Sequence, residues 1–240
     1  MCWSGEASAV LATAGLASTV YVAYKKEDKH LWLPLGYFSL MELLQAFTYV
    51  YIDSCGAPAN QILTLLGYLH ITFQPFFINM FAMHFIPKRV KEKIEDWVYA
   101  ICFVGAIAML IKLYPFDWAQ GCLIGTEPLC DASLCSVHGN WHIAWNVPLN
   151  SIANLQWGYA FPGLVLPFIY GSWKLGLYLY LLGPFMAHYF TSNLNEWPAV
   201  WCLFSIGLLL VVIKTPVRKA LYIKRKWFFW NYPGAKKLRK

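Results

Sequence analysis

Apolar residues in this chain are gathered in seven long stretches separated by shorter polar segments. Their ranges are 7–24, 31–52, 59–86, 97–114, 150–172, 174–191 and 197–214. A transmembrane helix needs about 20 mostly apolar residues to cross a hydrocarbon core of about 30 Å, and each stretch is close to that length. The pattern predicts an all-α fold, an integral membrane bundle of about seven transmembrane helices that occupies residues 1–214.

Lys and Arg residues are confined almost entirely to alternate connections of this pattern. The first, third and fifth connections and the segment from Lys214 hold 18 of the 19 basic residues, whereas only Lys112 lies near the opposite side. Cytoplasmic segments attract Lys and Arg in this way. The charges therefore predict an N-terminus outside the cytoplasm. They also predict a basic amphipathic cytoplasmic tail over 215–240, which we expect to lie on anionic inner-leaflet lipids.

Composition supports a membrane protein and excludes several other classes. The chain is 59% hydrophobic and only 13% charged, whereas soluble domains are about 25% charged. Its net charge of +7 follows from membrane topology, so no nucleic-acid partner is expected. No retinal is expected, because the last stretch has no Lys before Lys214, and no glycine-rich motif indicates a nucleotide. We expect the bilayer of a bacterial inner membrane or a plasma membrane, with a second membrane protein or a second copy as possible partners.

Residues 115–149 form the one long loop, which the topology places on the non-cytoplasmic side. Cysteines on that side meet an oxidising environment, so disulfides are expected among four of them, with three possible pairings and Cys2 left over. The four disulfide candidates are Cys55, Cys122, Cys130 and Cys135. His138 and His142 follow at i, i+4, which on a helix would place both on one face. A disulfide-stapled lid is the favoured interpretation, and a Cys/His metal site is the alternative.

Several polar residues fall inside the apolar stretches, where ionisable groups are costly and normally face the bundle interior. Glu42 lies near the middle of 31–52, with Gln45 on the same helical face. His70 has a similar depth in 59–86, and Gln74 follows one turn later. Because these two stretches are consecutive and antiparallel, we expect Glu42 and His70 to meet.

Glu42, His70 and Gln74 are therefore the candidate catalytic residues. Glu42 with two or three imidazoles would suit a divalent transition metal such as zinc, iron or copper, with Gln74 orienting one ligand. The candidate metal ligands are Glu42, His70, His142 and His188. Other polar residues that could complete the site are Cys2, Glu6, Gln45 and Asn193.

Three functions fit such a site, which would open to the non-cytoplasmic side. The leading hypothesis is a metal-dependent membrane enzyme that acts on a lipid or another hydrophobic substrate. The second is a non-catalytic sensor or accessory subunit of a membrane complex, in which Glu42 only locks helices together. The third is a metal or proton transporter, although the chain lacks the internal repeat that is common in transporters.

The opening Met1-Cys2-Trp3-Ser4 resembles an uncharacterised group of bacterial multi-pass membrane proteins that begin Met-Cys-Phe/Trp-Ser. Other short elements that are similar to that group are Glu42 and Gln45, His70 and Pro75, His142 to Trp145, and Val200 to Phe204, the last departing at Leu203. The resemblance spans most of the chain. It implies a multi-pass architecture and candidate residues, and it carries no activity.

Overall fold

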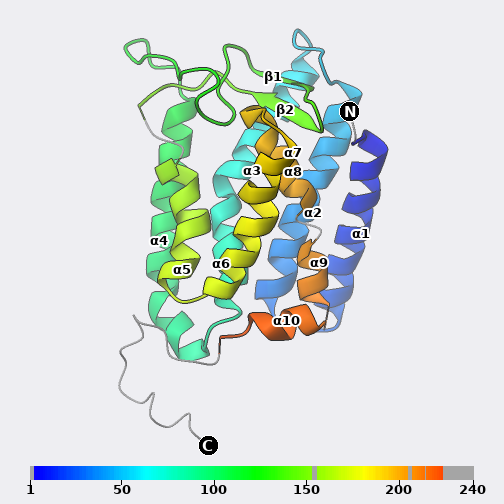
Figure 1. Ribbon diagram of the computed structural model, residues 1–240, viewed down its shortest axis with the longest axis vertical. Coiled ribbons are helices and arrows are strands. Elements are labelled where there is room, and N and C mark those ends of the chain that lie inside the picture. Colours follow the sequence, from blue (N-terminus) through cyan, green and yellow to red (C-terminus); the bar gives the residue numbers. More distant parts are fainter. Residues whose placement is uncertain (1–2, 153–155, 205–206, 214, 224–240) are drawn as a thin grey trace, which may run out of the picture.

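The chain forms a bundle of helices with a small layer of loop and sheet at one end (Figure 1). This computed structural model describes residues 3–152, 156–204, 207–213 and 215–223. Four long helices run along the longest axis of the molecule: α1 (Gly5–Tyr24), α2 (Lys29–Val50), α3 (Pro58–Met83) and α4 (Lys88–Leu113). The strands and the N-terminus lie at one end of the bundle, which we call the hairpin end. The short helix α10 (Pro216–Leu221) lies across the opposite end, which we call the α10 end.

The second half of the bundle consists of interrupted helices. Its elements are η1 (Gln156–Val165), α5 (Leu166–Ile169), α6 (Trp173–Tyr180), η2 (Leu181–Phe185), α7 (Met186–Phe190), η3 (Leu194–Glu196), α8 (Trp197–Phe204) and α9 (Gly207–Val212). η1 and η2 are π-helical and contain Pro162 and Pro184. Proline cannot donate the usual helical hydrogen bond, and π-helical turns are frequent at functional sites.

The prediction of an all-α fold is wrong for the outer loop. Strands β1 (Cys135–His138) and β2 (Ile143–Asn146) pair antiparallel there. Asn60 of α3 stabilises the strand because its side chain accepts from Ser136 N (2.9 Å) and donates to Ser136 O (2.9 Å). His138 and His142 consequently sit on either side of a hairpin turn, and the shared helix face expected for them does not exist.

Within the described residues, three helices are long and apolar enough to cross a membrane: α1, α3 and α4. The segment Trp157–Ile169 is a shorter apolar helix. α4 begins at Lys88, earlier than the predicted 97, because its charged first turns are helical too. These helices support membrane association, whereas the number of spans and their direction belong to the proposal below.

Small residues bring α1 and α2 into close contact. A Cβ atom at Gly15 would lie 2.1 Å from Ser39 Oγ, and one at Gly5 would lie 2.9 Å from Tyr49 Cβ. Small residues allow such close helix approach inside membranes. The consequence is that α1 presents the buried Ser8 to the polar middle of α2, where Glu42 lies.

The buried apolar side chains form two clusters. One joins the α10-end halves of the helices and includes Phe38, Phe81 and Leu221. The other lies beneath the hairpin and includes Met41, Trp145 and Cys202. Met41 directly precedes Glu42 in the sequence, and Cys202 lies near Glu42 in space. Glu42 is therefore embedded in the hairpin-end apolar cluster.

Candidate functional site

Glu42 lies at the centre of a buried polar cluster in the hairpin half of the bundle. Its side chain is 4% exposed, Ser8 lies beside it, and Tyr49 and Cys202 are electrostatic neighbours. Gln45 is one helical turn away, on the same face of α2. We call the following residues the Glu42 cluster: Glu42, Gln45, Gln74 and His142, with Ser8, Tyr49, Tyr159 and Cys202 around them.

The cluster contains buried polar atoms that make no hydrogen bond within the described part of the chain. They are Glu42 Oε1 and Oε2, Gln45 Oε1 and Nε2, Gln74 Nε2 and His142 Nε2, and the nearby Trp145 Nε1 belongs to the same set. Buried polar side chains are nearly always hydrogen-bonded, and exceptions in native structures call for an explanation such as catalysis or ligand binding. Here the exceptions converge from α2, α3 and the hairpin.

His142 follows the hairpin turn and is fully buried. Its Nδ1 accepts from Ile143 N at 2.7 Å and lies 3.1 Å from Tyr49 Oη. Since Nδ1 accepts a backbone N–H, the neutral ring carries its proton on Nε2. Burial lowers the pKa of His142 to about 3, so the imidazole is neutral at physiological pH. Its Nε2–H is therefore a buried donor rather than a free lone pair.

Glu196, at the end of η3, fixes the position of His142. Its Oε1 accepts from the backbone N–H groups of Trp141 and His142. Its Oε2 accepts from Asn140 N at 3.1 Å and from Thr191 Oγ1 at 2.7 Å. A fully buried carboxylate is stable only when donors surround it. Glu196 therefore clamps the hairpin turn to the start of α8.

Gln74 connects the cluster to the second half of the bundle. Its Oε1 accepts from Tyr159 Oη of η1, and Cys202 of α8 lies beside it. Cys202 in turn lies near Glu42. Gln74 is thus oriented by a phenol on one side and a thiol on the other, while its Nε2 makes no hydrogen bond within the described residues.

His70 packs against α2 at the edge of an open groove. Its ring stacks on Tyr37 at a centroid distance of 3.9 Å, and Tyr37 Oη donates to His70 O at 2.6 Å. Together with Phe73, His70 lines an open groove of about 760 Å³ between α2, α3 and α4. Its Nε2 and both Glu42 oxygens make no hydrogen bond in the described chain, so no hydrogen bond joins Glu42 to His70 there.

The other predicted residues are spread over the hairpin end. His188 is exposed, and its ring lies 5.6 Å from that of Trp197. Asn193 caps η3 by accepting from Asn195 N at 3.0 Å. Glu6 is exposed on α1, and Cys2 lies outside the described residues. None of the three described side chains, those of His188, Asn193 and Glu6, is placed in the Glu42 cluster by a described contact.

All four disulfide candidates are paired, as Cys55–Cys135 and Cys122–Cys130. The first disulfide joins the α2–α3 connection to β1, and the second closes a turn of the outer loop. Cys122, Cys130 and Glu127 also place ligand atoms within 4.8 Å of one another and could hold a metal. Only the reduced form would offer two thiolates, because the disulfide consumes them, and Glu127 already bonds Lys112 Nζ at 2.7 Å.

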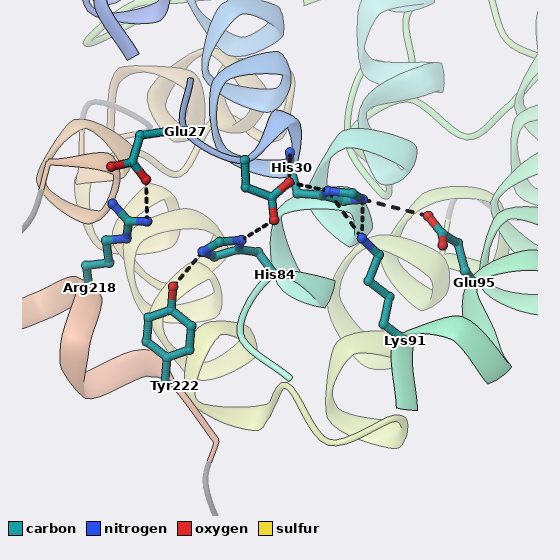
Figure 2. A network of polar contacts seen from close by, with 8 residues as sticks. Glu27, His30, His84, Lys91, Glu95, Arg218 and Tyr222 are labelled. Carbon is teal, nitrogen blue, oxygen red and sulfur yellow. Dashed lines mark hydrogen bonds and ion pairs between the residues drawn. The ribbon is translucent and has the colours of Figure 1, made fainter. Parts of the chain in front are cut away.

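A second polar network lies at the α10 end (Figure 2). Asp28 contacts His30 Nδ1 at 2.6 Å and His84 Nδ1 at 2.9 Å, and His84 Nε2 lies 2.6 Å from Tyr222 Oη. Burial alone would raise the pKa of Asp28, but the hydrogen bonds from His30 and His84 lower it well below its usual range. The network connects α2 and the end of α3 to the chain after α10.

Three further interactions extend this network. Lys91 Nζ lies 2.6 Å from His30 Nε2, and Glu95 Oε1 lies 3.7 Å from the same atom. Arg218 of α10 pairs with Glu27 at 3.0 Å, as Figure 2 shows. Because these groups satisfy one another across several helices, the network is structural: it fixes the α10 end of the bundle.

Sequence reasoning missed two contributors to the Glu42 cluster. Ser8 reads as one more small residue of α1, and Cys202 as a small apolar residue of its helix. Glu196 lies at the mouth of the last apolar stretch, where the sequence alone suggests a group that closes the site from the hairpin side. Its role depends on the hairpin that folds onto it, which no local pattern announces.

Comparison with known proteins gives a family but no activity. No curated protein and no solved structure matches the chain. A family model matches residues 6–222, which include the Glu42 cluster, the hairpin and α10. The chain therefore belongs to the family of unknown function DUF5765.

Proposed function

We propose that the chain is a multi-pass membrane protein with seven spans, the hairpin end outside and the α10 end in the cytoplasm. The four long helices and three interrupted helical segments, η1–α5, α6–α7 and α8–α9, supply the spans. Lys25, Lys91 and Arg218 lie at the α10 end, as the positive-inside rule requires. The helical unit would be residues 1–214. Most of the basic tail 215–240, proposed to lie on anionic inner-leaflet lipids, lies outside the described residues.

Within this topology, we propose that the Glu42 cluster binds and transforms the polar end of a lipid or another hydrophobic substrate. The observation that carries the proposal is the group of buried polar atoms of Glu42, Gln45, Gln74 and His142 that make no hydrogen bond within the described residues. A merely structural cluster would satisfy these groups among themselves. A site for a polar substrate group needs such donors and acceptors, held in place by other contacts.

The groups present suit general acid–base chemistry. The Glu42 carboxyl can accept or donate a proton at a substrate oxygen. The His142 Nε2–H can donate to a substrate oxygen, and the amides of Gln45 and Gln74 can orient it. A metal such as zinc, iron or copper fits less well, because His142 would have to give up its remaining ring proton to become a ligand while Nδ1 still accepts from Ile143 N.

The test compares wild type with Glu42→Gln and, as a matched control, with the exposed Glu6→Gln. Hydrophobic molecules that co-purify with each protein are extracted, returned to protein in vesicles and followed by mass spectrometry. We expect Glu42→Gln to retain a molecule that wild type converts, and to convert it about 100-fold more slowly or worse. Equal conversion by a folded Glu42→Gln protein would refute the catalytic role and favour a sensor or subunit.

Elemental analysis of the same samples separates the metal alternative. We expect clearly substoichiometric metal in wild type. Near-stoichiometric metal that is lost in Glu42→Gln and retained in Glu6→Gln would replace acid–base chemistry by a metal-dependent route at the same site.

A further inference from the structure

An apolar cavity of about 240 Å³ lies beside the Glu42 cluster. It is bounded by α3, η1, the η2–α7 helix, α8 and the outer loop, through residues that include Ile71, Leu129, Ala160, Ala187 and Trp201. Every lining side chain is apolar or aromatic. The cavity is therefore suited to a hydrocarbon group and offers no partner for a charge.

Tyr159 connects this cavity to the polar cluster. Its ring lines the cavity and lies edge-to-face with Trp201 at a centroid distance of 5.5 Å. Its hydroxyl donates to Gln74 Oε1, and Gln74 adjoins Cys202, which adjoins Glu42. An apolar wall and a polar site thus share one side chain.

Several local features hold the walls of the cavity in place. Leu129 has φ of 70°, a strained conformation for a branched residue. Its carbonyl accepts from Val147 N at 2.8 Å, and the next residue, Cys130, is in a disulfide. At Gly183 a Cβ atom would lie 2.6 Å from Trp201 Nε1, so only glycine lets this indole take its place.

From these observations we propose that the cavity receives one unbranched acyl or alkyl chain of the substrate, with the polar end of the substrate at the Glu42 cluster. The inference rests on the proposed function and names its substrate class: a lipid that inserts a single chain. Pockets for drug-sized ligands occupy about 300–1,000 Å³. This cavity is smaller, so it accommodates a chain segment rather than a ring system or two chains together.

Photo-crosslinking tests the proposal with a defined probe, a palmitic acid analogue that carries a diazirine on its chain. The full chain in bilayer nanodiscs is irradiated, and adducts are located by mass spectrometry. We expect adducts within 159–164 and 184–201 in wild type. In Ala160→Leu, labelling there falls by about fourfold for each buried methylene group that the larger side chain displaces.

Two comparisons keep the result interpretable. Ala187→Leu narrows the same cavity from the opposite wall and replaces Ala160→Leu if that variant misfolds. Ala14→Leu makes the same change on the exposed face of α1 and should label as wild type does. Equal labelling of the cavity peptides in the two cavity variants and in Ala14→Leu would overturn the proposal, as would wild-type adducts confined to the groove at His70.

Glu42→Gln distinguishes this proposal from the proposed function. It should retain the cavity adducts, because the chain-binding wall is intact, while it loses conversion. Retained adducts with unchanged conversion would refute the role of Glu42 and leave the chain cavity standing. If Glu42→Gln loses conversion but wild type shows no cavity adducts, the role of Glu42 stands and the chain cavity is refuted.

Discussion

Replacing Glu196 by Gln tests whether one buried carboxylate positions the hairpin above the Glu42 cluster. The carboxylate accepts four hydrogen bonds, three from the backbone N–H groups of Asn140, Trp141 and His142 and one from Thr191 Oγ1. Gln has nearly the same shape but keeps one acceptor oxygen, and its amide places N–H donors where the second oxygen stood. The Thr191 hydroxyl can rotate to accept, whereas a backbone N–H cannot.

The expected loss follows from these contacts. Asn140 is exposed at the turn, so water can reach its freed N–H, and the loss of this bond lies at the lower end of the usual range, about 1 kcal/mol. A hydrogen bond to a charged group is worth about 1 kcal/mol more than a neutral one, and the two bonds from Trp141 and His142 are weakened in this way. Glu196→Gln should therefore destabilise the hairpin by about 3 kcal/mol.

Hydrogen exchange read by mass spectrometry measures this loss locally. Amides of the peptide that contains Asn140, Trp141 and His142 should exchange about a hundredfold faster in Glu196→Gln, since about 1.4 kcal/mol is a factor of ten. Peptides of the α10 end should be unchanged, and the exposed Glu6→Gln is the matched control. Protection of the turn within about threefold of wild type would show that the clamp does not hold the hairpin.

Three further predictions concern stability. Burial lowers the pKa of His142 to about 3, against about 6.5 in the unfolded chain, so the unfolded chain binds more protons at pH values between these two. The free energy of unfolding should therefore fall by about 2 kcal/mol from pH 6.5 to pH 5. In denaturant titrations, His142→Gln should remove this pH dependence. Replacing Cys55 and Cys135 by Ser opens a disulfide that spans 80 residues, and it should lower the free energy of unfolding by about 4 kcal/mol in the same titration. This loss should be about 2 kcal/mol larger than the loss on opening the shorter Cys122–Cys130 bridge. Equal losses would contradict this prediction. Gly15→Ala forces a Cβ atom to within 2.1 Å of Ser39 Oγ and should cost about 1–3 kcal/mol, whereas Gly56→Ala meets nothing within 4 Å and should leave the melting temperature unchanged.

Sequence reasoning located the chemistry better along the chain than in space. It selected Glu42, Gln45, Gln74 and His142, whose side chains are all buried and carry polar atoms without a hydrogen bond in the described residues. It also paired Glu42 with His70 because of equal depth. Depth fixes only one coordinate, and the rotation of α3 about its axis turns His70 toward Tyr37 and the open groove.

The loop at 115–149 gives a second example of contacts that the sequence alone could not predict. Four cysteines on the oxidising side predict disulfides, but three pairings remained open until β1 placed Cys135 beside Cys55. The i, i+4 spacing of His138 and His142 suggested a helix. Strands form instead, because the Asn60 side chain and the β1–β2 pairing provide hydrogen bonds for the backbone of this segment.

What the sequence determined by itself is therefore the one-dimensional content: apolar lengths that suit helices in a bilayer, the distribution of basic residues, and the short list of polar residues inside apolar stretches. These follow from local composition, because transfer into hydrocarbon depends on each segment alone. The tertiary structure decided which polar groups meet, which cysteines pair, and that an apolar cavity adjoins Glu42. Those outcomes depend on helix rotation, on the π-helical turns at Pro162 and Pro184, and on Glu196 anchoring a distant hairpin. They are properties of packing between segments, which no single segment encodes.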